Sequence, residues 1–121
     1  LLRLAVHDQA PAYRDAAQMA LGAVSDLWER YGFLAADYAH AVWWATTEPP
    51  TLTVWAARPE ERKAFAKAAF EAYVPGLTVS FRTPAAADDV RAVVCAGTVC
   101  QTVPSPDDLP QVLWALREHG Q

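Results

Sequence analysis

One short stretch decides how this chain folds: residues 48–56, which read EPPTLTVWA. Before this stretch, apolar residues recur at intervals of three and four, which is the spacing of a helix. The two prolines cannot continue a helix. After them, apolar and polar residues alternate as they do in a β-strand. The stretch therefore divides the chain into a helical segment, residues 1–48, and a small α/β unit, residues 49–121.

The helical segment is predicted to contain three helices. Residues 1–6 have the pattern of the last turns of a helix. A long helix follows over residues 11–31, with a proline in its first turn and Gly32 as its terminator. A third helix is expected over residues 34–46. Because the chain begins inside an apolar helical pattern without a capping residue, we expect it to be the carboxyl-terminal piece of a longer protein.

The α/β unit is predicted to run strand, helix, strand, strand, strand, helix. A helix joins the first two strands, so these should be parallel with a right-handed crossover. The last two strands should form a hairpin. In the final helix, Ser105 is the expected N-cap, Pro106 the first helical residue and Gly120 the terminator. The expected strands are residues 51–56, 77–82, 93–95 and 99–103, and the expected helices are residues 59–74 and 106–119.

Composition excludes several classes of protein. The chain has 121 residues, 53% of them hydrophobic, and a net charge of −4. It shows no basic stripe of the kind a nucleic-acid partner requires. No apolar run approaches the roughly 18 residues of a membrane helix. Without a recognisable secretion signal, a cytoplasmic location is expected. Abundant Ala and Arg with few Lys residues favour a bacterial source.

The two cysteines are placed by a predicted turn. Gly97 suits the first central position of a type II′ hairpin turn, with Thr98 as the second. In that register Cys95 faces Cys100 as a non-hydrogen-bonded pair, with Cα atoms about 4.5 Å apart. The two sulfurs should then lie on one face of the sheet, with Val94 and Gln101 on the other.

Three states of this cysteine pair remain open from the sequence. Cys95 and Cys100 could be reduced and packed as small hydrophobic side chains. They could instead form a labile disulfide that acts as a redox pair, because a bridge across so short a loop adds little stability. Metal binding is the third possibility, but zinc requires four ligands and no further Cys or His cluster accompanies the pair. We therefore predict no metal site.

An aromatic cluster on the third helix is the other candidate site. It comprises Trp43 and Trp44 with Tyr38, and His40 could line a cavity beside the two tryptophans. Neighbouring helical positions point about 100° apart, so the two indoles cannot share one face. The residues could line a cavity that stacks sugars, or they could form contacts with another domain. His40 could equally be an exposed or internally hydrogen-bonded histidine.

No catalytic residue or cofactor site can be assigned from the sequence. The acidic pairs at residues 88–89 and 107–108 have the positions of loop and capping residues. There is no glycine-rich phosphate loop and no arrangement of Ser, His and Asp for nucleophilic catalysis. Whether the chain belongs to an enzyme therefore stays open.

Several segments together resemble a known family. They are LLRLA at residues 1–5, YRDAA at 13–17, Pro50 followed by a strand, and above all VCAGTVCQ at 94–101. In this order they resemble the carboxyl-terminal end of YyaL-type thioredoxin-domain-containing proteins, which include spermatogenesis-associated relatives. The resemblance implies an amino-terminal thioredoxin-like domain, then an α/α toroid similar to N-acylglucosamine 2-epimerases, then this tail. Residues 1–48 would be the last toroid helices, and residues 49–121 a thioredoxin-like terminal unit.

The resemblance implies a structural or docking role, with the remainder of the parent protein as partner or with self-association through residues 1–48. The turn where a thioredoxin-like fold carries its Cys-x-x-Cys motif reads ARPE at residues 57–60, without cysteine. A redox accessory element built on Cys95 and Cys100 is the first alternative. The second is that the helices form a wall of a carbohydrate-processing cavity.

Overall fold

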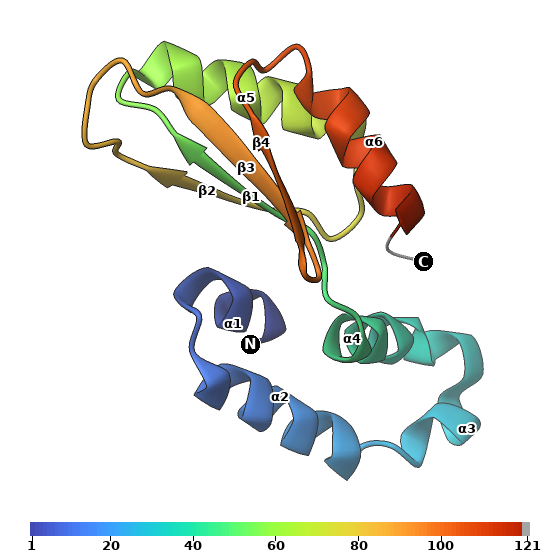
Figure 1. Ribbon diagram of the computed structural model, residues 1–121. Helices are drawn as coiled ribbons and strands as arrows, with labels where there is room; N and C mark the ends of the chain where they lie inside the picture. Colours follow the sequence, from blue (N-terminus) through green and yellow to red (C-terminus); the bar gives the residue numbers. More distant parts are fainter. Residues whose placement is uncertain (120–121) are drawn as a thin grey trace. The chain divides into compact units, whose positions relative to one another are not determined.

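The computed structural model describes residues 1–119, except for the side chains of residues 27, 28, 34 and 117–119. The chain forms two compact units that meet at the bond between Glu48 and Pro49. Figure 1 shows the helices and strands of both units.

The first unit is entirely helical. Its first helix ends at Asp8, and the following residue, Gln9, adopts the left-handed conformation with a φ of 51°. Gly32 has a φ of 54°, which confirms it as a helix terminator. The elements are α1 (Leu2–Asp8), α2 (Pro11–Ala23), α3 (Leu27–Tyr31), a 3₁₀ turn (Gly32–Ala35) and α4 (Ala36–Thr46).

The prediction of one continuous helix over residues 11–31 is wrong. The helix is interrupted after Ala23, where the backbone N–H groups of Val24 and Ser25 bond to carbonyls only three residues back. The interruption contains Ser25 and Asp26, whose side chains hydrogen-bond to each other at 3.3 Å. Side chains of this type compete with helical backbone bonds, and Gly22 just before them adds backbone freedom. The long apolar pattern therefore forms two helices.

The second unit is a four-stranded mixed sheet with two helices. The strands lie in the order β2-β1-β3-β4, with β1 and β2 parallel and the other neighbours antiparallel. The predicted parallel crossover and the predicted hairpin are both confirmed. The elements are β1 (Thr51–Trp55), α5 (Pro59–Ala72), β2 (Thr78–Arg82), β3 (Arg91–Ala96), β4 (Val99–Val103) and α6 (Leu109–His119).

The core of this unit lies between one face of the sheet and the two helices, which cover the same side of it (Figure 1). On β1, Leu52 and Val54 are completely buried, while the alternate residues Thr51, Thr53 and Trp55 are only half-buried. The strand therefore shows the alternation that its sequence predicts. The remaining core positions come from every other element except β2, and they are Ala56, Phe65, Ala68, Ala69, Ala72, Ala92, Val94, Val103, Leu109, Leu113 and Leu116.

The last helix begins at Leu109, three residues later than predicted. Ser105 still acts near its start, because its hydroxyl accepts a hydrogen bond from the backbone N–H of Asp107 at 3.3 Å. The later start follows from Pro110, which has no N–H to donate and fits only within a first helical turn. Starting the helix at Pro106 would place Pro110 in its interior. The predicted terminator, Gly120, lies outside the described residues.

Two phenylalanines on α5 provide a matched test of this core. Phe65 is 1% exposed and Phe70 is 78% exposed. We expect Phe65→Ala to lower the free energy of unfolding by about 3–5 kcal/mol, because it opens a cavity. Phe70→Ala should change it by no more than about 0.5 kcal/mol. Urea denaturation monitored by circular dichroism measures both, and equal losses would show that the assigned core is wrong.

Candidate functional site

The β3–β4 hairpin holds the two cysteines as the turn predicts. Gly97 has a φ of 56°, and the described non-glycine residues with positive φ do not include Thr98. A positive φ at the first central residue alone is the property of a type II′ turn. Cys95 pairs with Cys100 across the ladder, and the two sulfurs form a disulfide. The predicted register is confirmed.

The spacing of the pair identifies its position in the ladder. The Cα atoms of Cys95 and Cys100 are 4.1 Å apart. That is close to the spacing of about 4.5 Å in a non-hydrogen-bonded pair and well short of about 5.5 Å in a hydrogen-bonded one. Val94, next to Cys95, is completely buried on the helix-covered face. The disulfide therefore lies on the opposite face of the sheet.

One of the two bridged cysteines, Cys100, is exposed to solvent. Cys100 is exposed and Cys95 is half-buried. Within the described part of the α/β unit, no helix covers this face of the sheet (Figure 1). Thr51 is the residue of β1 paired with Cys95. An exposed disulfide with neutral neighbours can be attacked by a thiolate from outside the chain.

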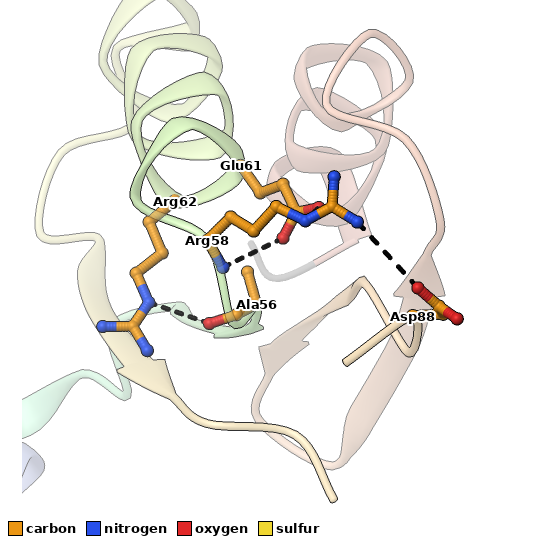
Figure 2. Close-up of polar contacts among 5 residues, drawn as sticks. All are labelled: Ala56, Arg58, Glu61, Arg62 and Asp88. Carbon is orange, nitrogen blue, oxygen red and sulfur yellow. Dashed lines mark hydrogen bonds and ion pairs between the residues drawn. The ribbon is translucent and has the colours of Figure 1, made fainter. Parts of the chain in front are cut away.

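The amino-terminal end of α5 carries a group of polar contacts instead of a redox motif (Figure 2). The backbone N–H of Arg58 donates to Oε2 of Glu61 at 3.2 Å, which satisfies one donor at the helix start. Nε of Arg62 donates to the carbonyl of Ala56 at 2.8 Å. An ion pair of 3.9 Å joins Arg58 to Asp88. These contacts stabilise the turn between β1 and α5.

The aromatic cluster on α4 is divided between two environments. Trp44 is 7% exposed and Trp43 is 40% exposed, yet the two indole rings meet edge to face, with their centroids 5.8 Å apart. The indole N–H of Trp44 donates to Nε2 of His40 at 3.1 Å. The guanidinium of Arg3 lies over the Trp44 ring, 5.3 Å from its centre. Trp44 is thus held by a polar contact on its edge and a cation on its face.

Helices α1, α2 and α4 border an open groove of about 640 Å³. His40 and Trp44 line it, whereas Trp43 does not. Its polar groups are Arg3, Asp37 and His40, and the rest of the lining is apolar. Sequence reasoning did not find Arg3 or Asp37, because their contribution depends on how three helices pack. Since Trp44 is buried and Trp43 lies outside the groove, the lining offers no open indole pair for stacking a sugar.

Of the other acidic candidates, Asp88 and Asp89 form ion pairs. Asp88 pairs with Arg58, and Asp89 pairs with Arg91. In the described residues no group of three His, Cys, Asp or Glu side chains lies close enough to hold a metal ion. No described helix is both long and apolar enough to span a bilayer. Comparison with family models, curated proteins and solved structures finds no match for this chain.

The state of the disulfide can be tested by alkylation and stability measurements. We expect Cys95 and Cys100 to resist alkylation in the oxidised chain and to be alkylated together after treatment with dithiothreitol. Because the cysteines are only 5 positions apart, replacing both with serine should lower the free energy of unfolding by no more than about 2 kcal/mol. The reduced wild-type chain is the control and should match the double variant. Alkylation of both cysteines without reductant, under every oxidising condition, would contradict the bridge.

Proposed function

We propose that this chain is a docking segment, in which the helical unit completes its core against further protein. One observation carries the proposal. Among residues 1–48 whose side chains the structure describes, the buried apolar side chains are Ala17 and Trp44. The other buried apolar side chains of the described chain all belong to the α/β unit. A helical unit with so little interior depends on a partner for its stability.

The apolar surface of the helical unit supports the same conclusion. Phe33 is 87% exposed and Met19 is 73% exposed. Single exposed apolar residues are ordinary, but here they accompany a groove with an apolar lining and an almost empty core. The other large apolar side chains exposed in this unit are Leu1, Leu4, Tyr13, Val24, Tyr31 and Trp43.

The partner we propose is preceding sequence of the same polypeptide, as in YyaL-type thioredoxin-domain-containing proteins. In such a protein, residues 1–48 would end an α/α toroid and residues 49–121 would be a thioredoxin-like terminal unit. The strand order β2-β1-β3-β4, with β3 antiparallel to the other three, supports this proposal because it is the order of a thioredoxin-like sheet. The absence of cysteine from residues 57–60 supports a non-catalytic role for the unit.

Amide hydrogen exchange tests the docking proposal. In the 121-residue chain, amides of α2 and α4 should exchange far faster than those of β1 and β3, because the helices lack a core of their own. In the product of the complete gene, exchange in α2 and α4 should slow by at least about 100-fold, while β1 and β3 stay unchanged. Equal protection of the helices in both proteins would contradict the proposal.

A pair of phenylalanines localises the effect. Phe33→Asp should remove the added protection of α2 and α4 in the complete gene product, because it places a charge where we expect the covering surface. Phe70→Asp is the matched control, since Phe70 is 78% exposed but lies on α5. A gene that encodes no sequence before Leu1 would overturn the proposed partner.

A redox accessory role is the second candidate, and the exposed Cys100 in the disulfide favours it. A thiolate of a protein dithiol would attack Sγ of Cys100, and Cys95 would leave as a thiolate that takes up a proton. The second thiol of the partner would then attack the mixed disulfide and release Cys100. Two electrons pass to the cysteine pair, and the partner leaves as its own disulfide.

A further inference from the structure

Strand β4 is an unprotected edge of the sheet. It has a neighbour on one side only, and Val99, Cys100, Gln101 and Thr102 are all exposed. Sheet edges are normally protected by charged side chains, prolines or bulges. The sequence of β4, VCQTV, has neither charge nor proline, whereas the opposite edge strand ends in Arg82. An edge of this composition can accept another strand.

The position of the disulfide shows which backbone groups are available at this edge. Hydrogen-bonded and non-hydrogen-bonded pairs alternate along an antiparallel ladder. Since Cys95 and Cys100 form a non-hydrogen-bonded pair, so do Val93 and Thr102, two positions further on. The N–H and C=O groups of Cys100 and Thr102 therefore point away from β3, toward the open edge. Those of Val99 and Gln101 point toward β3.

We infer that β4 pairs antiparallel with β4 of a second copy of this chain. Gln101 lies on the two-fold axis of the proposed pair, and Cys100 stands opposite Thr102 of the partner subunit. In this register the outward-pointing backbone N–H and C=O groups of Cys100 and Thr102 are all hydrogen-bonded. Cys100 and Thr102 of the partner subunit exchange two hydrogen bonds, as residues do in a hydrogen-bonded antiparallel pair. Moving the register by two residues would leave part of these groups unpaired. The two sheets become one continuous sheet.

The side chains on the helix-covered face fit the same register. Val99 of the partner subunit would stand opposite Val103 and enter a groove of about 410 Å³ between β4 and α6. Val99 is 54% exposed in the single chain, so pairing would bury apolar surface. By symmetry the reverse contact forms at the other end of the strand. The groove is lined in part by Val103, Pro104, Asp108, Gln111, Val112 and Ala115.

A second copy fits this edge because the surface is complementary to itself. The charge-free β4 meets no like charge when it faces its own copy, and the exposed valine meets the part of the groove lined by Val103 and Val112. A strand without an apolar side chain opposite Val103 would gain the backbone bonds alone. Reciprocal use of one patch by both subunits is the usual geometry of a homodimer.

Charge substitutions on the two-fold axis test the pairing. Sedimentation velocity of the full wild-type chain should show a monomer–dimer equilibrium. Gln101→Lys and Gln101→Glu should each weaken dimerisation by at least about tenfold, because like charges directly opposite destabilise a cross-strand pair. Mixing the two variants should restore a dimer, which is a heterodimer. Gln18→Lys, the same change at an exposed position of α2, should leave the equilibrium unchanged.

Amide exchange resolved by NMR gives a second measurement. The amides of Cys100 and Thr102 should become more protected as concentration rises, while those of Val99 and Gln101 should not change. A wild-type chain that stays monomeric would overturn the inference, as would a dimer that survives both Gln101 substitutions. The latter result would indicate association through residues 1–48 instead, so this test is separate from that of the docking proposal.

Discussion

The burial of one face of the sheet beneath α5 and α6 is the constraint on which the α/β unit depends. Leu52, Val54 and Val94 are all completely buried at this contact. Because side chains alternate along a strand, fixing these residues on the inner face fixes all others on the outer one. Thr53 then bonds to Ser80 at 3.2 Å, and Arg91 lies over the ring of Trp55. The disulfide belongs to the outer face for the same reason.

Local chemistry in the sequence was sufficient to predict much of this unit. The two prolines before β1, the positive φ of Gly97 and the alternation of apolar residues all act within a few residues of where they appear. The cysteine register followed from the turn alone. The start of α6 could also have been predicted correctly, since Pro110 excludes an earlier start. The break after Ala23 was missed because an apolar stripe outweighed a short Gly-x-x-Ser-Asp segment in the prediction.

The groove of the helical unit and the open edge of the sheet could not be predicted in this way. Arg3 and Trp44 are far apart in sequence, and their contact depends on α1 packing beside α4. Which strand lies at the edge is likewise a property of the whole sheet, because the sequence of a hairpin does not show which of its two strands pairs with a further strand. Both candidate surfaces thus depend on tertiary arrangement, whereas the cysteine pair depends on a turn of two residues.

Cys100 links the proposed redox role to the sheet edge. Its sulfur is bonded to Cys95, and its backbone groups point to the open side of β4. The disulfide adds a covalent restraint between β4 and β3, one residue pair away from the turn. It therefore keeps the outward groups in the extended geometry that a second strand requires, and reduces the entropy that pairing would cost. Reduction would leave the backbone bonds of the hairpin in place but remove this restraint. The same residue thus belongs both to the disulfide and to the strand pairing that we propose.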